Sequence, residues 1–462
     1  MKPAFDLPQA QNGLGSACET NAALDRCEIR MRTATPTGFP ELLFYAVILS
    51  LPFEEWKSIA GMTISKCLGL LFFLFSPGDW RIFYGRTPAL FIAFGLFIGI
   101  GLVVDLSYLS YGSSMLNFSM RPLLLCVLMV VSYNLAVHGR LKRVVMAVYL
   151  SSLLYAIVQC FLYQGASTRI DTELVDGGLL DRSAVLGADE NFAACYVALC
   201  IPPGLIYGFN LIPTRWIYRV LALAGSAIGF YGMLKTSSRG GMLAIAVGVL
   251  CIVLTATHMA KKVKYAVLVA AIIGIMAMAV MNNPLLQHRV TSSLQTRETA
   301  GRTEIWSRAA RLYLESPFYG FGSFMHMRKL GEVTGHSMRG THNLFLSVLL
   351  SSGILGFSLF MYFYWRSFQA VWRRRAEGEC SVVFAWFMTA LVAGLSINVE
   401  TTKWFWIVVA LALAARKQPW HTGHRPSHPA FCAALLPDAS ATPLHAPCPV
   451  ASSVHHSWIQ PR

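Results

Sequence analysis

Residues 342–364 read HNLFLSVLLSSGILGFSLFMYFY and contain no Asp, Glu, Lys or Arg. A helix that crosses the hydrocarbon core of a bilayer needs about 20 mainly apolar residues, and this segment meets that requirement. Comparable apolar stretches recur along the chain, for example YAVLVAAIIGIMAMAVM at 265–281. The sequence therefore predicts an all-α, polytopic integral membrane protein.

The composition indicates the same fold class. Of the 462 residues, 55% are hydrophobic and 13% are charged, and the mean hydropathy is +0.52. A soluble domain carries about 25% charged residues. The composition therefore excludes an ordinary globular enzyme, a disordered chain and a disulfide-stapled secreted module. The formal net charge of +15 primarily indicates membrane topology, because Lys and Arg accumulate in cytoplasmic loops.

We predict about twelve transmembrane helices, with one large loop between the ninth and the tenth. The first and the last of these segments are short for a span. The expected spans are 38–53, 59–76, 88–106, 120–137, 144–163, 190–210, 217–234, 240–257, 265–281, 342–364, 382–399 and 403–416.

The loops between these spans alternate in charge. Residues 105–120 contain no Lys or Arg, and 171–190 is acidic. The basic loops hold Arg81 and Arg86, Arg140, Lys142 and Arg143, Arg215 and Arg219, Lys261, Lys262 and Lys264, and Arg366, Arg373, Arg374 and Arg375. Short basic loops stay in the cytoplasm, so we expect both termini there and the 164–189 loop, the 235–239 turn and the 282–341 loop on the opposite side.

Three regions follow from this topology. Residues 1–37 form a polar cytoplasmic tail, and residues 38–416 form the transmembrane domain. Residues 417–462 are rich in Pro and His, and we expect a disordered cytoplasmic tail. No sequence pattern typical of a metal site or a cofactor site is present, and the eleven Cys fit buried small hydrophobes better than disulfides. A nucleic-acid partner is not expected, because the positive charge serves loop orientation.

The first candidate functional constellation is Lys235-Thr-Ser-Ser238-Arg239-Gly240-Gly241, between the seventh and eighth spans. Arg239 lies at the start of a helix, where free backbone N–H groups favour anions. The glycines allow a ligand close to the backbone, and a guanidinium grips two phosphate oxygens at once. The segment fits a diphosphate cradle, and the alternative is an Arg that anchors the helix at the lipid headgroups.

The second constellation lies in the 282–341 loop. Gly301-Arg302 begins a helical pattern in which Ile305, Ala309, Leu312 and Ser316 share one side, so we expect an amphipathic helix at the interface. Arg302 is a second candidate for phosphate. For Arg308 and Arg311, a solvated face that touches lipid phosphates is the stronger reading, with substrate binding as the alternative.

The third constellation is Thr341-His342-Asn343, at the start of the tenth span. The positive end of a helix dipole disfavours the imidazolium, and a neutral imidazole can accept a proton from a hydroxyl. We expect Thr341 to cap the helix and Asn343 to orient His342, although a lone His is often structural. Asp189-Glu190-Asn191 and Glu400 lie at helix ends on the same side, and Asn191 and Glu400 are candidate substrate-binding residues. A carboxylate at either end could position a sugar hydroxyl or pair with an Arg, and the alternative is a helix-end charge in the headgroup layer.

These segments together resemble the O-antigen ligase and polymerase superfamily. The resemblance rests on Thr236 to Gly241, on Gly301-Arg302 with Trp306, on Pro317 with Gly320 and Gly322, on His342-Asn343 with Leu346, and on Asp189 to Ala193. It covers 185–360 by motif and 38–416 by topology.

The resemblance implies a metal-independent glycosyltransferase of the bacterial inner membrane with a periplasmic active site. Such enzymes transfer a glycan from undecaprenyl diphosphate, without a cofactor. Ligases transfer it to the lipid A core, and polymerases transfer it to another lipid-linked repeat of O-antigen, capsule or exopolysaccharide. By motif, Arg239 and Arg302 would bind the diphosphate and His342 would be the general base. The expected reaction is one displacement at the anomeric carbon, which inverts it.

Two alternatives remain beside the ligase. A polymerase shares the active residues, and the moderate outer loop favours a ligase. A lipid-linked glycan flippase, from a different class, would need charges inside the membrane. The cores of the third to sixth and of the eighth to eleventh predicted spans carry none, and Lys66 in the second span is the exception.

Overall fold

A computed structural model of the chain describes residues 38–53, 57–59, 62–76, 90–108, 113–161, 169–175, 178–184, 189–296 and 301–417. The predicted N-terminal tail, the C-terminal tail beyond residue 417 and the basic loop with Arg81 and Arg86 lie outside the described residues. The predicted tail boundaries therefore stay predictions.

Each predicted span contains helix, and the pair α8 and α9 forms the sixth, but Ile59, Met62 and Thr63 of the second predicted span lie in short strands. The helices are α2 (Phe39–Ser50), α3 (Ile64–Phe75), α5 (Leu90–Leu106), α6 (Ser113–Leu135), α7 (Leu141–Phe161), α8 (Glu190–Ala198), α9 (Ile201–Gly208), α10 (Trp216–Thr236), α11 (Arg239–Leu254), α12 (Met259–Met281), α16 (Leu344–Arg374), α17 (Glu379–Gly394) and α18 (Lys403–Ala414). Short helical turns follow α2, α6, α17 and α18: η1 (Leu51–Phe53), η3 (Ala136–Arg140), η5 (Val399–Thr401) and η6 (Ala415–Lys417).

Length and hydropathy make several of these helices fit to cross a membrane. Among the described residues, five stretches are long and apolar enough, and five shorter apolar helices accompany them. The five long stretches are Arg121–Phe161, Glu190–Gly208, Trp216–Thr236, Met259–Met281 and Leu344–Arg373. The chain is therefore a largely helical, polytopic membrane protein, and the number of twelve spans stays a prediction.

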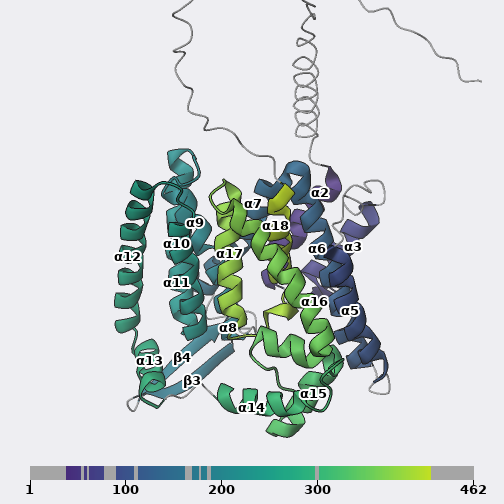
Figure 1. Cartoon of the computed structure of the whole chain (residues 1–462). Helices are drawn as coiled ribbons and strands as arrows, with labels where there is room; N and C mark the ends of the chain where they lie inside the picture. The colour runs from purple at the N-terminus through teal and green to yellow at the C-terminus, as the bar shows by residue number, and fades with distance from the viewer. Residues whose placement is uncertain are drawn as a thin grey trace, which may run out of the picture. The chain divides into compact units, whose positions relative to one another are not determined.

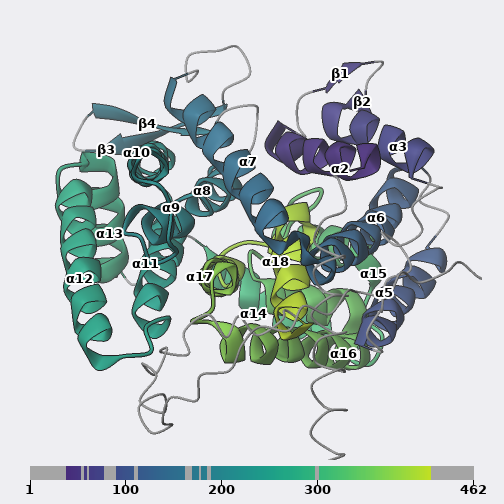
Figure 2. The same ribbon diagram turned by 90° about the horizontal axis from the view of Figure 1, so that it is seen from above.

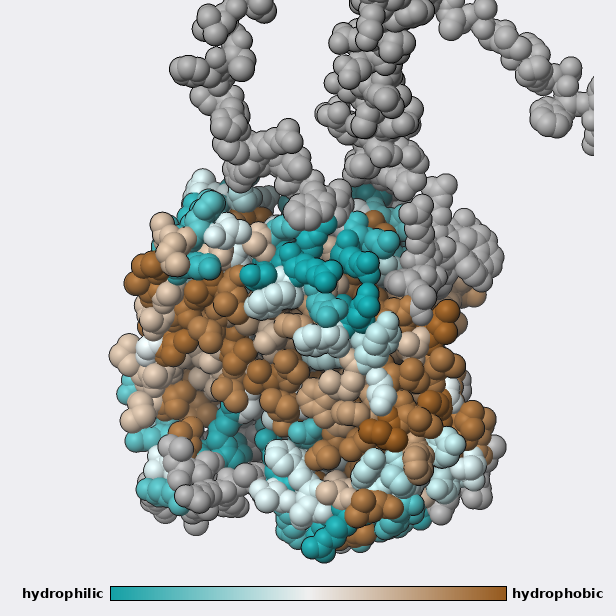
Figure 3. Space-filling view, viewed as in Figure 1, coloured by the Kyte–Doolittle hydropathy of each residue, from teal (hydrophilic) through white to brown (hydrophobic). Residues whose placement is uncertain are grey.

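Surface and loops are arranged as such a protein requires. Figure 3 shows a hydrophobic band across the middle of the molecule, with hydrophilic surface above and below it. In Figure 1, the α9–α10 connection and the start of α12, which both carry basic residues, lie at the upper end. The extramembrane helices α13 (Pro284–Thr296), α14 (Arg302–Tyr313) and α15 (Gly322–Thr334) lie at the lower end. Basic connections and the 282–341 segment thus occupy opposite ends of the bundle.

The all-α prediction needs a correction. Two antiparallel hairpins are present, β1 (Lys57–Ile59) with β2 (Met62–Thr63), and β3 (Arg169–Val175) with β4 (Gly178–Ala184). Val175 pairs with Gly178, and the sequence between them is Asp-Gly. That dipeptide favours the two-residue turn of a hairpin, and this signal was overlooked. The β3–β4 hairpin contacts α8, α10 and α13.

The last two helices form the centre of the packing. Figure 2 shows α17 and α18 inside a ring formed by the other helices. Trp386 of α17 and Trp404 and Trp406 of α18 are almost fully buried. The Trp386 indole donates a hydrogen bond to the Leu199 carbonyl (2.6 Å). The shortest predicted span is thus a core helix, which needs fewer residues than a lipid-exposed span because protein surrounds it.

The tenth span is interrupted, which the sequence reading did not anticipate. Within α16, Gly353 has φ 60° and ψ −170°. The turn after α14 docks into this break: the Ile354 amide donates to the Pro317 carbonyl (2.8 Å) and the Phe321 amide donates to the Leu350 carbonyl (2.8 Å). A Cβ at Gly353 would collide with the Phe318 carbonyl. Gly353 therefore allows the turn after α14 to pack against α16, which connects the extramembrane helices to the bundle.

Candidate functional site

The three residues proposed for chemistry line one cavity. We name it the arginine cavity; it has a volume of about 170 Å³ and lies at the end of the bundle that carries α13 and α14. Its lining residues are Asn191, Arg239, Gly240, Arg289, Arg302, Ile305, Arg339 and His342. Arg239 and His342, which are about 100 positions apart along the chain, thus line the same cavity.

Arg239 is the first residue of α11, as predicted. The left-handed Ser237 ends α10, and Ser238 caps α11 by accepting the Gly241 amide (3.2 Å). A Cβ at Gly240 would meet the Ser396 hydroxyl, so only glycine lets this helix start pack against the α17–α18 connection. The exposed amides of the helix start therefore face the cavity beside a guanidinium.

Arg239 and Arg289 hold each other in place. The Arg239 guanidinium donates to the Arg289 carbonyl (2.7 Å), and the Arg289 guanidinium donates to the Ser237 carbonyl (3.0 Å). Each cation is therefore oriented by a neutral carbonyl, which leaves its charge uncompensated by these two contacts.

Arg302 begins α14, after the left-handed Gly301. Ile305 and Ala309 bury the apolar side of this helix, which confirms the predicted amphipathic pattern. Burial and the neighbouring Arg239 lower the pKa of the Arg302 guanidinium, against a smaller raising effect of Asp189. Arg302 nevertheless stays protonated, because the pKa of arginine starts far above neutrality.

His342 lies in a strained turn immediately before α16. Its φ is +50°, which is unfavourable for a residue with a Cβ. The Trp306 indole donates to the Thr341 carbonyl (3.0 Å), and the Asn398 amide oxygen accepts from the Thr341 hydroxyl and from the Asn343 backbone N–H, both at 3.2 Å. Contacts on both flanking residues therefore fix the direction of the imidazole.

The predicted roles of the flanking residues need a correction. Asn343, not Thr341, caps α16, because its side-chain oxygen accepts the amides of Phe345 (3.0 Å) and Leu346 (3.1 Å). The Thr341 hydroxyl instead donates within the turn and to Asn398. His342 therefore lies two residues before the first residue of α16.

The electrostatic setting keeps the imidazole neutral. Burial and the cations Arg302 and Arg339 lower the pKa of His342 below its usual value, whereas Asp189 opposes them. Asp189 itself caps α8 by accepting the amides of Asn191 (2.9 Å) and Phe192 (3.3 Å). An unprotonated imidazole at neutral pH can accept a proton.

The arginine cavity has a cationic lining. Four guanidiniums line it, and none of its lining residues among those the structure describes is a carboxylate. The Nε of Arg339 is buried and has no hydrogen-bond partner among the described residues. Because Arg cannot lose its charge, such a cluster is stabilised when an anion with several oxygens enters. Among the described residues, no group of three or more His, Cys, Asp or Glu could hold a metal ion.

The other predicted site residues lie outside this lining. The Ser238 hydroxyl donates to the Asn191 side-chain oxygen (2.9 Å) and thereby orients a lining residue. The Lys235 ammonium lies over the Tyr231 ring (5.4 Å to the centroid). Arg308 pairs with Glu304 (2.5 Å) and with the Val333 carbonyl, and Arg311 is exposed. Both arginines lie on the polar side of α14, as the stronger reading held.

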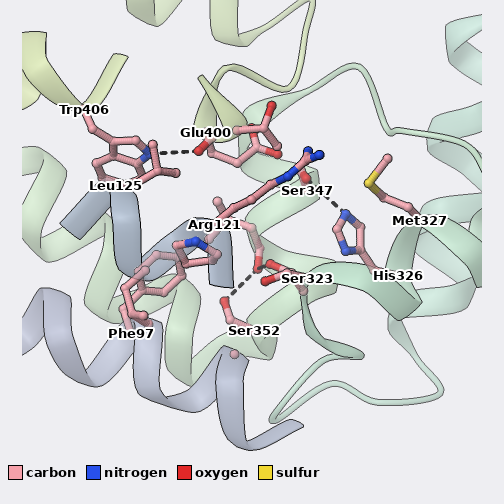
Figure 4. Close-up of a pocket in the computed structure, with 16 residues that line it drawn as sticks. Phe97, Arg121, Leu125, Ser323, His326, Met327, Ser347, Ser352, Glu400 and Trp406 are labelled. Atoms are coloured by element: carbon pink, nitrogen blue, oxygen red, sulfur yellow. Dashed lines mark hydrogen bonds between the residues drawn. The ribbon is translucent and has the colours of Figure 1, made fainter. Parts of the chain in front are cut away.

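Glu400 lines a different cavity, which we name the Glu400 cavity. It measures about 80 Å³ and is shown in Figure 4. It is lined by Phe97, Ile98, Gly101, Arg121, Pro122, Leu125, Ser323, His326, Met327, Ser347, Val348, Ser351, Ser352, Glu400, Thr401 and Trp406. Glu400 thus belongs to a site separate from the arginines.

Sequence reasoning missed Arg289, Arg339 and Asn398. Arg289 and Arg339 had been treated as the ends of the outer segment and not as part of the site. Their signal was available: arginines in the long outer loop do not serve topology, so they needed another explanation. Nothing in the sequence links Asn398 to His342, because that contact depends on the packing of the α17–α18 connection.

Comparison with known proteins places these residues in a family. A family model described as O-antigen ligase matches residues 224–361, a segment with all four cavity arginines and His342. The chain is also similar to the O-antigen ligase of Pseudomonas aeruginosa (strain PAO1), at 30% identity over 122 residues. That match covers 25% of this chain and 30% of the relative. Residues 224–361 therefore match the O-antigen ligase family model, and the chain spans 30% of the length of the relative that it matches.

Proposed function

We propose that the protein transfers a glycan from undecaprenyl diphosphate to a lipid A–core acceptor at the periplasmic face of the bacterial inner membrane. The observation that carries this proposal is the arginine cavity, in which four guanidiniums and a neutral imidazole share one space, with no carboxylate among the described lining residues. A diphosphate carries several negative oxygens in a compact group, and guanidiniums bind such oxygens with two parallel hydrogen bonds.

In this proposal, Arg239 and Arg302 bind the donor diphosphate, and Arg289 and Arg339 complete the anion site. Negative charge grows on the diphosphate as its bond to the sugar breaks. Fixed cations that await this charge lower the barrier, because they need no reorganisation at the moment of reaction. The start of α11 adds backbone N–H groups on the same side.

His342 acts as the general base. Its neutral imidazole takes the proton from an acceptor hydroxyl while that oxygen forms a bond to the anomeric carbon. The bond between the anomeric carbon and the diphosphate oxygen breaks, and both electrons leave with undecaprenyl diphosphate. One such displacement inverts the anomeric carbon. No separate acid is required, because the diphosphate is a stable anion between the arginines.

The sidedness of the reaction follows from the loops. Basic connections and the arginine cavity lie at opposite ends of the bundle. If the basic loops are cytoplasmic, both termini are cytoplasmic and the cavity faces the periplasm. Reporter fusions at the α9–α10 connection and in the 301–341 segment measure this orientation directly.

A polymerase of lipid-linked repeats is the second candidate, because it would use the same cavity. Deletion of the gene separates the two in the native host. A lipid A core without long polymer, together with accumulated lipid-linked polymer, identifies a ligase. A core that carries one repeat identifies a polymerase, and loss of a secreted polysaccharide with unchanged lipopolysaccharide identifies a capsule or exopolysaccharide enzyme.

Substitution of the cavity residues tests the chemistry. We expect Arg239→Ala and His342→Ala each to reduce glycan transfer at least about a hundredfold, measured as polymer-bearing lipopolysaccharide on gels, at normal membrane levels of the protein. Arg308→Ala, on the polar side of α14, is the matched control and retains transfer. Wild-type transfer by either cavity variant would contradict the assignment. Accumulation of lipid-linked glycan on the cytoplasmic side after gene deletion would also contradict it, because that is the result expected for loss of a flippase.

A further inference from the structure

The Glu400 cavity lies directly behind the arginine cavity. Its walls come from α5, α6, α15, α16, η5 and α18. Arg339, which lines the arginine cavity, donates its backbone N–H to the carbonyl of Met327, which lines the Glu400 cavity (2.9 Å). Ser347 also lines the Glu400 cavity, and it accepts from the Asn398 amide (3.3 Å) that holds the His342 turn. Residues of the two linings are therefore in direct contact.

Glu400 presents an unused polar atom to this cavity. Its Oε2 is buried and has no hydrogen-bond partner among the described residues. Leaving such an atom unpaired costs about 1–3 kcal/mol. The backbone carbonyl of Glu400 is satisfied, because it accepts from the Trp406 indole (2.8 Å). Oε2 is therefore the atom of Glu400 with which a ligand could form a hydrogen bond.

Two titratable groups of the lining, Glu400 and His326, are shifted toward their neutral forms by burial. Burial raises the pKa of Glu400 to about 8, against a hydrogen bond from Ser347. Burial lowers the pKa of His326 to about 4. The His326 Nδ1 donates to the Gly322 carbonyl (2.9 Å), so its Nε2 is an acceptor, 3.3 Å from the Ser347 hydroxyl. Neutral donors and acceptors suit a neutral hydroxylated ligand better than a metal cation.

The rest of the lining has the character of a sugar site. Figure 4 shows Arg121, Ser323, Ser347 and Ser352 around the space between Glu400 and the aromatic Phe97 and Trp406. Hydroxyls and a guanidinium can hydrogen-bond sugar hydroxyls, and aromatic rings cover the apolar faces of sugar rings. An isoprenoid or acyl chain would leave Glu400 unpaired, which disfavours it.

We propose that the Glu400 cavity binds a saccharide unit of the acceptor, with the Glu400 side chain as its central hydrogen-bonding group. This inference rests on the proposed transfer function, and it places the acceptor on the far side of the His342 turn from the donor diphosphate. An acceptor anchored there extends its nucleophilic hydroxyl toward His342, while the donor occupies the arginines.

The test measures acceptor binding without turnover. The probe is the core oligosaccharide released from lipopolysaccharide of the deletion strain, titrated calorimetrically into the full-length purified protein. We expect Glu400→Leu to weaken binding about tenfold and Ser323→Leu, which fills the cavity, to weaken it at least as much. Arg239→Ala binds the probe as the wild type does, and Glu332→Leu, an exposed carboxylate of α15, is the matched control.

A kinetic assay then separates this inference from the proposed function. Donor and acceptor are both extracted from the deletion strain, and the half-saturating concentration of each is measured. We expect Glu400→Leu to raise only the acceptor value. Unchanged probe binding in both cavity variants, or a change confined to the donor, overturns the acceptor site. Transfer by Arg239→Ala overturns the proposed function instead, whatever Glu400 does.

Discussion

The linings of the arginine cavity and the Glu400 cavity are in contact, but burial affects the charge of their ionisable residues differently. In the arginine cavity, backbone carbonyls accept hydrogen bonds from the guanidiniums of Arg239 and Arg289. In the Glu400 cavity, burial drives both Glu400 and His326 toward their neutral forms. The comparison teaches that residue type decides the outcome of burial, because Arg retains its proton where Glu and His change theirs. The arginine cavity is therefore proposed to bind an anion, and the Glu400 cavity is proposed to bind a neutral ligand.

The largest effect is expected from loss of a guanidinium in the arginine cavity. Arg302→Ala removes a buried cation from the proposed leaving-group site, and we expect transfer to fall about a hundredfold to a thousandfold. Arg302→Lys keeps the charge but loses the two-pronged grip on phosphate, so its activity should lie between the two. Initial transfer rates with extracted donor and acceptor measure both.

Arg311→Ala is the control for this prediction. Arg311 lies on the same helix but on its exposed side, so its loss should change the rate less than about twofold. Equal losses for the two alanine variants would mean that α14 acts only through its general positive charge.

A smaller effect sharpens the boundary between the cavities. Asn398→Ala removes the acceptor that fixes both neighbours of His342, and we expect kcat to fall about tenfold, since misorientation of the base affects the chemical step. Asn398→Asp keeps that acceptor and should restore much of the rate. Ser347→Ala acts on the opposite side of the same amide and should change the half-saturating acceptor concentration more than kcat.

This split distinguishes positioning from general stability. A merely structural Asn398 would lower the amount of folded protein, and the conservative variant would not selectively recover kcat. If Asn398→Ala and Ser347→Ala change the same kinetic parameter, the two cavities do not serve separate substrates.

The sequence predicted much of the bundle because hydrophobic segments of span length have few alternatives. All twelve predicted segments contain helix, and Arg239, Arg302 and His342 lie at element starts close to where the sequence placed them. The reason is that local residues set the helix starts: Gly301 adopts a left-handed conformation before α14, and Ser238 caps α11.

The remainder depends on packing between distant segments. The break of α16 at Gly353 exists because the Pro317–Phe321 turn docks there, and an apolar run carries no sign of that. The same holds for Asn398 beside the His342 turn and for the neutral state of Glu400. Arg289 and Arg339 were within reach of sequence reasoning, because topology gave them no role.

The smallest expected effect concerns pH, and it tests His342 itself. Because its pKa lies below the usual 6.5, the imidazole is unprotonated at and above that pH, and transfer should decline only when the pH falls below the lowered pKa. Arg339→Gln removes a cation that disfavours protonation, so the pKa rises and the acid limb of the rate profile moves to higher pH. Asp189→Asn keeps a capping side chain on α8 but removes an anion that favours protonation, so the acid limb moves to lower pH. Profiles of kcat/KM from about pH 5 to pH 8 measure both shifts, and displacement in the same direction in the two variants would show that another group controls the acid limb.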